Sequence, residues 1–390
     1  MGCLLMARRV AFGVEYLSDY RAGIARVGTD LFRALVAADR QTEYIFVANR
    51  EMPREYRENI QPHKQVQQSG FYQKLPDLIA IPLWVQFQLP RILKQLKLDL
   101  YLHTGMPPLI PLLPPWQKIR KIIFLHDVIN VKSPRFFKPI TFLHGSVAKW
   151  LALRSFDHVF CNSVATKNEA VRLLKVNPEK ITVVHLGISE AFNKLPSTEA
   201  LDRARRIVGN DDVPFVLFVG TIEPRKNLEG LLHGFKLSGL TNNHRLVVVG
   251  AKGWKTSGIY KLVKKLDLND AVVFGGFVPD EELCALYRSA TLFCYPSFDE
   301  GFGLPVLEAM ACGCPVVASG VPAIIEVGGD APLYIDPKNT GSIASALRKV
   351  AENKSPKESM ARRGMERASM FSWEKAALEV SKVMDRMIAS

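Results

Sequence analysis

Short apolar runs alternate with amphipathic stretches along most of this chain of 390 residues. Runs of this length between turn signals are typical of buried strands, and the stretches between them have a helical period. Strands that alternate with helices form parallel sheets covered by helices. In the first half the pattern predicts strands at 9–13, 44–48, 98–103, 121–125, 158–161 and 181–184, with helices at 24–38, 83–97 and 165–174.

The alternation is interrupted by a polar, turn-rich stretch at residues 189–214 and then restarts. We therefore expect two Rossmann-like α/β domains, residues 1–195 and 196–372, followed by a C-terminal segment, 373–390, whose helix packs back on the first domain. The predicted strands of the second domain are 215–220, 245–250, 272–274, 292–295, 315–317 and 333–335, and its helices include 227–237, 280–288, 304–311 and 340–351. Two such domains joined by one linker predict a ligand cleft between the carboxyl ends of their strands.

The net charge of +13 is concentrated in the first half of the chain. Residues 1–195 hold 27 Lys and Arg against 15 Asp and Glu, whereas residues 196–390 hold 24 against 23. Between residues 60 and 155 the count is 13 basic to 3 acidic. The aromatic residues interleaved there are Trp84, Phe87, Trp116, Phe136, Phe137 and Trp150. This mixture suits an anionic membrane surface or a nucleic-acid backbone, and equally a solvated basic face of an ordinary enzyme domain.

The sequence argues against several classes of protein, namely membrane-spanning, exported, metal-binding and P-loop or dinucleotide-binding proteins. No apolar run reaches the ~20 residues that a membrane-spanning helix needs, and Arg8 and Arg9 follow the first apolar patch instead of preceding it, unlike an export signal. The six cysteines are scattered in apolar patterns, as buried reduced thiols are, and lack the spacing of a metal site. The sequence also lacks G-x-G-x-x-G after the first strand and a P-loop. We expect a cytoplasmic protein, or one peripheral on the inner face of the membrane, without a bound metal or resident cofactor.

Residues 297–315 (SFDEGFGLPVLEAMACGCP) carry the first chemical signal. A strand leads into a turn with Gly301 and Gly303, which free backbone N–H groups for a ligand, and the following helix N-terminus favours an anion. Glu300 and Glu308 are eight positions apart, so helical rotation would place both carboxylates on one side, two turns apart. That separation suits the hydroxyls of two sugar rings in an extended ligand. The alternative is one solvated and one helix-capping glutamate.

A second signal is the segment 220–227 (GTIEPRKN), where the first strand of the second domain ends. Arg225 and Lys226 leave the strand as a helix begins, with Asn227 as its expected N-cap. Two cations beside a helix N-terminus predict a diphosphate site, and the alternative is an idle surface pair.

Two weaker signals lie in the first domain. His126 follows the strand 121–125 and would face the predicted cleft, with Asp127 either positioning it or capping a turn; a histidine that only packs or caps is equally compatible. Gly23 precedes the helix 24–38 and would let a ligand approach the start of that helix.

These motifs resemble the retaining GT-B glycosyltransferases of family 4. Residues 300–308 (EGFGLPVLE) match the family's E-x7-E motif, and 220–228 (GTIEPRKNL) resemble its diphosphate-binding turn. The family's order is also followed by His126-Asp127, Asn162-Ser163 with Thr166-Lys167, the Gly23 loop and 371–373 (FSW). One departure is the loop 20–26, which has a single glycine where the family often has more.

The resemblance implies a GT-B fold and a metal-independent, retaining hexosyltransferase, with mannose from GDP-mannose as the first choice of donor. Arg225 and Lys226 would neutralise the diphosphate, Glu308 would bind the ribose and Glu300 the donor sugar, while His126 would lie near the reacting sugar. The remaining residues implied to line the donor are Gly23, Gly220, Phe277, Val278, Gly301, Phe302, Gly303 and Leu304.

The acceptor is expected to be a glycan or a polyprenyl-diphosphate-linked lipid, and the basic first half to touch an anionic membrane, with no nucleic acid as partner. Within enzymes, a glycan phosphorylase on the same fold is disfavoured because no lysine-linked pyridoxal signature is present. A binding-only GT-B protein, or a protein that binds nucleic acid or membrane through its basic half, stays as the alternative. Retention of both Glu300 and Arg225 favours the enzyme.

Overall fold

The computed structural model describes residues 8–14, 23–39, 41–48, 65–66, 83–104, 119–136, 149–150, 153–209, 213–253 and 256–390. These residues form two compact units, one comprising Met1–Gly187 with Trp373–Ser390 and the other Ile188–Ser372. The division falls eight residues before the boundary expected at 195/196. Helix α8 (Glu190–Asn193) belongs to the second unit because the ring of Phe192 is buried there, 6.1 Å from that of Tyr287.

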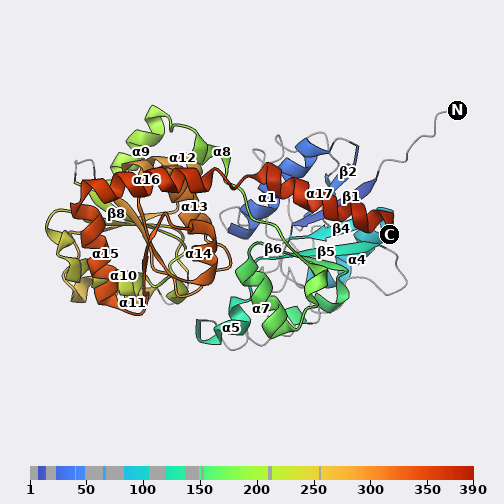
Figure 1. Ribbon diagram of the computed structural model, residues 1–390, viewed down its shortest axis with the longest axis horizontal. Coiled ribbons are helices and arrows are strands. Elements are labelled where there is room, and N and C mark those ends of the chain that lie inside the picture. The colour runs from blue at the N-terminus through green and yellow to red at the C-terminus, as the bar shows by residue number, and fades with distance from the viewer. Residues whose placement is uncertain are drawn as a thin grey trace. The chain divides into compact units, whose positions relative to one another are not determined.

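The first unit contains a seven-stranded parallel sheet in the order β3-β2-β1-β4-β5-β6-β7 (Figure 1). Its strands are β1 (Arg9–Val14), β2 (Glu43–Ala48), β3 (Gln65–Val66), β4 (Leu100–His103), β5 (Arg120–Leu125), β6 (His158–Cys161) and β7 (Ile181–Val183). The six predicted strands are confirmed, and β3 is an addition too short to give an apolar run. The strand order reverses between β1 and β4, which makes a topological switch point at their carboxyl ends.

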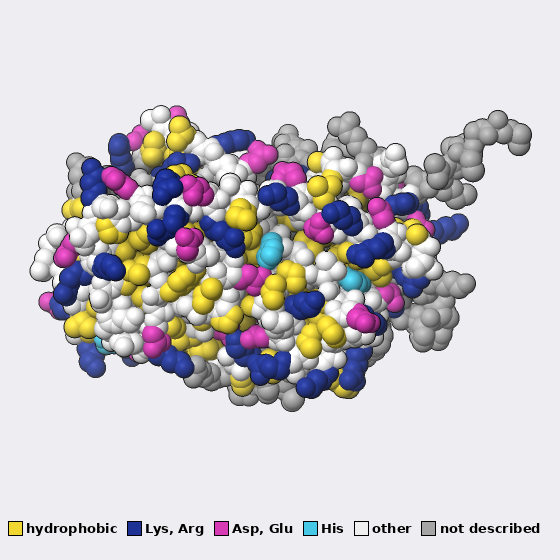
Figure 2. Space-filling view, viewed as in Figure 1, with side chains coloured by type: hydrophobic (Ala, Val, Ile, Leu, Met, Phe, Trp, Pro, Cys, Tyr) yellow, Lys and Arg dark blue, Asp and Glu magenta, His cyan; other side chains and the backbone are white. Residues whose placement is uncertain are grey.

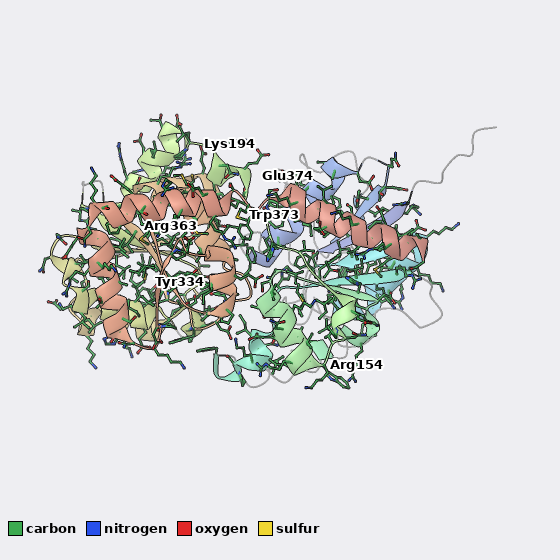
Figure 3. The ribbon with its side chains drawn as sticks, viewed as in Figure 1. Arg154, Lys194, Tyr334, Arg363, Trp373 and Glu374 are labelled. Carbon is green, nitrogen blue, oxygen red and sulfur yellow. The ribbon has the colours of Figure 1, made fainter. Side chains whose placement is uncertain are left out.

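Helices cover the sheet of the first unit. They are α1 (Gly23–Ala38), α4 (Leu89–Gln95), α5 (Ile129–Lys132), α7 (Val164–Leu174) and the C-terminal α17 (Trp373–Ala389), which packs on α1. Trp373 and Glu374 begin α17 (Figure 3). The helix expected at 83–97 is interrupted: a π-helical turn, η2 (Trp84–Gln88), precedes α4, whose first turn holds Pro90. Proline lacks the N–H that a continuous α-helix would use at this point.

The second unit contains a six-stranded parallel sheet in the order β10-β9-β8-β11-β12-β13. Its strands are β8 (Phe215–Val219), β9 (Arg245–Val249), β10 (Val272–Gly276), β11 (Leu292–Tyr295), β12 (Val316–Ser319) and β13 (Leu333–Ile335), all confirming predictions. Its switch point lies between β8 and β11. The helices of this unit are α9 (Thr198–Val208), α10 (Leu228–Ser238), α11 (Ser257–Lys265), α12 (Asp280–Ser289), α13 (Leu304–Ala311), α14 (Pro322–Gly328), α15 (Thr340–Glu352) and α16 (Lys354–Ala368).

The prediction of a polar linker at 189–214 is wrong for most of this range, because helices α8 and α9 occupy it. The Ser197 hydroxyl caps α9 by accepting from the backbone N–H of Ala200. Ala200, Ala204 and Val208 form its buried face at four-residue spacing. Two of these three residues are alanines, which give a weak apolar signal among many charges.

Each sheet carries its own apolar core. Cys161, Cys284, Cys294, Cys312 and Cys314 are buried without a disulfide among the described residues, as expected for reduced thiols. Within the described ranges, no helix combines the length and the apolar character that crossing a bilayer requires.

Candidate active site

The switch point of the second sheet brings together the two segments that the sequence singled out. The short helix η5 (Pro224–Lys226) follows β8, and Glu300 lies in the turn after β11, the neighbouring strand. Arg225 Nη1 lies 2.8 Å from Glu300 Oε2, and Lys226 Nζ lies 2.8 Å from Glu300 Oε1. Arg225 also donates to the backbone carbonyl of Asp299 at 2.8 Å. One carboxylate is thus clamped by two cations, each on its own oxygen.

Two further side chains complete this network, and the sequence reasoning missed both. Arg225 Nη2 lies 2.5 Å from Glu223 Oε1, and Lys226 Nζ donates to the Tyr295 hydroxyl while lying 4.7 Å from that ring's centroid. The four charged side chains are each exposed by 15% or less. Two carboxylates therefore balance two cations in a mostly buried cluster, which we call the switch-point network (Glu223, Arg225, Lys226, Tyr295 and Glu300).

The electrostatics of the switch-point network keep Glu300 charged. Burial acts to raise the pKa of Glu300, but Arg225 and Lys226 together outweigh it and hold the pKa at about 2. Burial lowers the pKa of Lys226, and Arg225 acts in the same direction, whereas Glu300 and Glu223 raise it. Glu300 is consequently a carboxylate at neutral pH, and the ammonium form of Lys226 depends on both of its acidic neighbours.

The turn that presents Arg225 and Lys226 is fixed by Asn227, the expected N-cap. Its Oδ1 accepts from Gly230 N at 3.2 Å, which confirms the cap of α10, and its Nδ2 donates to the carbonyls of Pro296 and Pro337. Gly220 has φ +150° beside the Lys226 side chain. A Cβ on Gly250 would lie only 2.2 Å from the Gly220 carbonyl oxygen, so the ends of β8 and β9 approach as closely as glycine permits.

The E-x7-E segment differs in one respect from its expected geometry. Helix α13 begins at Leu304 after Gly303 at φ +105°, so Glu300 lies in the turn before the helix and rotation along a helix does not relate it to Glu308. Glu308 is buried on α13, with its Oε2 3.4 Å from the Tyr287 hydroxyl. The alternative of a solvated and a capping glutamate is excluded because both carboxylates are mostly buried.

The remaining predicted donor residues lie on neighbouring loops. Gly301 and Phe302 connect Glu300 to α13, and the buried Phe302 ring packs edge-on against Phe371. Phe277 follows β10 with 45% of its surface exposed, whereas Val278 beside it is buried. Phe277 is therefore at the surface, and the Val278 side chain packs in the core.

His126 stands at the carboxyl end of β5 in the first unit. Its Nε2 donates to the carbonyl of Thr104 at 2.9 Å, and its ring stacks on Phe124 with centroids 5.2 Å apart. Asn162 Nδ2 donates to the His126 carbonyl at 2.8 Å. Burial lowers the pKa of His126, so the neutral ring with its proton on Nε2 is favoured.

Asp127 caps the turn that follows His126. Its Oδ1 accepts from the backbone N–H of Ile129 at 3.1 Å and from Lys149 at 3.3 Å. Lys149 also donates to Asn130 Oδ1 at 2.8 Å. Of the two roles considered for Asp127, the structure shows turn capping. Gly23 is the first residue of α1, and the loop before it lies outside the described residues.

The aromatic residues of the basic stretch 60–155 have different environments. Trp84 and Phe136 are buried, so the prediction that they face a membrane is wrong: apolar rings in this stretch build the core. Phe87 and Trp150 are 52% and 39% exposed. The Arg154 guanidinium lies 3.6 Å from the Trp150 ring centroid at the lower edge of the first unit, where basic side chains gather (Figures 2 and 3). Trp116 and Phe137 lie outside the described residues.

Comparisons with known proteins place this chain in a family. HepE of Anabaena, solved in complex with UDP and glucose, superposes with a TM-score of 0.76 at 20% identity, covering 96% of this chain and 99% of HepE. The two units, each a parallel sheet covered by helices, have the GT-B fold, as predicted. Family models for glycosyl transferases group 1 and glycosyltransferase family 4 match residues 202–367 and 21–192. The chain belongs to this glycosyltransferase family.

Two relatives from Escherichia coli align with the greater part of the chain. O-antigen chain mannosyltransferase B is 32% identical over 257 residues, which cover 65% of this chain and 67% of the relative. Serotype-specific mannosyltransferase WbdA is 25% identical over 283 residues, 71% of this chain and 34% of the relative. The match thus spans about two thirds of the former and one third of the latter.

Proposed function

We propose that this glycosyltransferase transfers a hexose, with mannose from GDP-mannose as the first choice, to a lipid-linked or surface-polysaccharide acceptor with retention of anomeric configuration. The observation that carries the proposal is the clamping of Glu300 by Arg225 and Lys226 at the switch point. Two relatives named as mannosyltransferases support the choice of sugar.

Arg225 and Lys226 are proposed to hold the donor diphosphate. Both cations already share their charge with carboxylates, so a diphosphate would draw them partly away from Glu300. The Glu300 oxygens would then accept hydrogen bonds from hydroxyls of the donor sugar. This exchange of partners would couple donor binding to the placement of the sugar.

Glu308 and the loops around it are proposed to hold the remainder of the donor. Glu308, buried on α13, would accept from the ribose hydroxyls, and the exposed ring of Phe277 would flank the base. Backbone N–H groups at 301–304 would line the sugar and phosphates, where the start of α13 favours an anion. Gly220, which has no side chain, would leave room for the sugar and the phosphates of the donor.

The chemical step requires stabilisation of an oxocarbenium-like sugar and a departing diphosphate. Arg225, Lys226 and the N-terminus of α13 would carry the charge that develops on the leaving group, without a metal ion. Within the described ranges, no group of three or more His, Cys, Asp and Glu side chains is arranged to hold a metal. His126 and Gly23 would act from the first unit, with the neutral imidazole near the reacting sugar.

The acceptor side is proposed to use the first unit. Its excess of basic residues, together with the exposed rings of Phe87 and Trp150, would meet an anionic membrane surface or a polyprenyl-diphosphate-linked acceptor, on the cytoplasmic face of the membrane.

The test is incubation of the purified protein with a panel of nucleoside-diphosphate sugars, in which water takes the place of the acceptor and receives the hexosyl group, followed by measurement of nucleoside-diphosphate release. Wild type is expected to release nucleoside diphosphate, fastest from GDP-mannose, and Glu300→Ala to abolish most of the release. Glu229→Gln, an exposed carboxylate on α10, is the matched control and should behave as wild type. Binding without turnover of any sugar would favour a binding-only GT-B protein instead.

A further inference from the structure

Glu223 is the member of the switch-point network to which the motifs assign no role. It precedes η5, and its carboxylate is mostly buried with Oε1 2.5 Å from Arg225 Nη2. Glu223 stands at the N-cap position of η5, but its side chain makes no capping hydrogen bond, and its backbone carbonyl accepts from Lys226 N. The carboxylate therefore acts on Arg225 and not on the helix.

Arg225 is held at two separate nitrogens. Nη1 faces the Glu300 carboxylate and the Asp299 carbonyl, and Nη2 faces Glu223. A guanidinium is planar, so contacts at both nitrogens fix its plane as well as its position. Pro224 separates the two residues of the Glu223–Arg225 pair and restricts the backbone between them.

We propose that Glu223 is a positioning residue that keeps the Arg225 guanidinium aimed at the donor diphosphate when Glu300 turns to the donor sugar. The inference rests on the proposed function. Before the donor binds, either carboxylate alone would hold Arg225. Once Glu300 accepts from sugar hydroxyls, Glu223 is the acidic partner that stays on Nη2, and Nη1 can pass from Glu300 to a phosphate oxygen.

Glu223 also contributes to the charge of the second cation. Lys226 faces Glu300 from the turn after β11, Tyr295 from β11, and Arg225 and Glu223 from its own turn. Burial raises the pKa of Tyr295, which keeps that hydroxyl protonated. Of these neighbours the two glutamates favour the ammonium form of Lys226, so neutralising Glu223 shifts Lys226 toward the neutral amine.

The experiment is a double-mutant cycle on nucleoside-diphosphate release with Glu223→Ala, Arg225→Ala and the double variant. Because displacement of a reacting group by about 1 Å can cost up to ~100-fold in rate, Glu223→Ala is expected to lower kcat about 10- to 100-fold with a smaller change in donor KM. In the Arg225→Ala background the same change should lower kcat much less than it does in wild type, because Glu223 then has no guanidinium to position and acts only on the charge of Lys226.

Two further measurements separate positioning from a structural role. Glu223→Gln, which keeps an acceptor oxygen, should recover part of the lost kcat but move the alkaline limb of the kcat profile to lower pH through Lys226. Glu229→Gln should leave both the rate and the profile unchanged. Melting temperatures of all variants identify any loss of fold.

The outcomes are distinct for the inference and for the function on which it rests. An active wild type with Glu223→Ala at the same kcat, or with losses that multiply in the double variant, overturns the positioning role and leaves the proposed function intact. Wild type that turns over none of the nucleotide sugars overturns both.

Discussion

Lys226 and Glu300 are 74 positions apart in the chain, and their Nζ and Oε1 atoms lie 2.8 Å apart. The parallel sheet brings them together, because the turns after β8 and β11 meet at the carboxyl edge of neighbouring strands. Removing either the carboxylate or one of the cations would leave a buried charge without its partner, which strongly destabilises a fold. The ion pairs therefore hold the turn after β8 and the turn after β11 together.

The first prediction concerns stability and pH. The pKa of Glu300 is depressed from 4.5 to about 2 in the folded protein, so its ion pairs stabilise the fold above pH 4.5 and are lost as the pH falls toward 2. The difference in free energy of unfolding between wild type and Glu300→Gln should therefore narrow on acidification, by about 2 kcal/mol at about pH 3. Urea unfolding at a series of pH values measures it; a difference that stays constant contradicts the assignment.

The second prediction concerns Glu308. If it binds the donor ribose, the interaction is present before and during the reaction, so Glu308→Gln should raise donor KM about tenfold or more with little change in kcat. Tyr287→Phe, which removes the neighbouring hydroxyl but leaves the carboxylate, should have a smaller effect. Steady-state kinetics with varied donor decides the matter, and a loss confined to kcat would argue against a ribose contact.

The third prediction concerns the protonation of His126. Burial lowers the pKa of His126 below 6.5, so the fold loses stability as the pH falls below 6.5, where the unfolded chain takes up a proton and the neutral ring of the folded chain does not. NMR of the imidazole C–H groups, assigned with a His126→Gln sample, should show that His126 does not titrate near 6.5 but at lower pH. A midpoint above 6.5 would be inconsistent with this site.

The fourth prediction concerns the membrane. Vesicles containing anionic lipid should bind the protein at low salt and shift Trp150 fluorescence, while neutral vesicles should not. Arg154→Ser should weaken binding about fivefold, since a basic side chain near such a surface contributes about 1 kcal/mol. Lys354→Ser, an exposed change on α16 in the second unit, is the control. Equal binding to neutral vesicles, or no binding to anionic ones, would contradict the membrane proposal and favour the interpretation of the basic stretch as a solvated face.

Much of the fold could be predicted from the sequence because buried parallel strands leave continuous apolar runs, as in β8 and β11. Helix α9 was missed because its buried face consists largely of alanines. The prediction that Trp84 and Phe136 contact a membrane was wrong because the sequence does not show whether an aromatic residue in a basic stretch packs in the core or lies on the surface.

The sequence predicted which two segments form the site, but it did not predict the contacts within the switch-point network. Arg225, Lys226 and Glu300 stand at turns that the strand pattern locates, but their mutual pairing depends on which strands are neighbours. Glu223 and Tyr295 carry no motif signal of their own; the only local hint is an acidic residue two positions before Arg225. The start of α13 at Leu304 was predicted, but the helical rotation used to relate Glu300 to Glu308 does not apply, because Glu300 lies in the turn before that helix.

The central claim, that Arg225 and Lys226 at the switch point bind a diphosphate, is tested most directly by calorimetric titration of GDP, with guanosine for comparison, into wild type and Arg225→Ala. Wild type should bind GDP much more tightly than guanosine, and Arg225→Ala should lose about tenfold or more in affinity for GDP, because hydrogen bonds between charged groups contribute about 1.5–3 kcal/mol. Equal affinity of the two proteins for GDP would contradict the account.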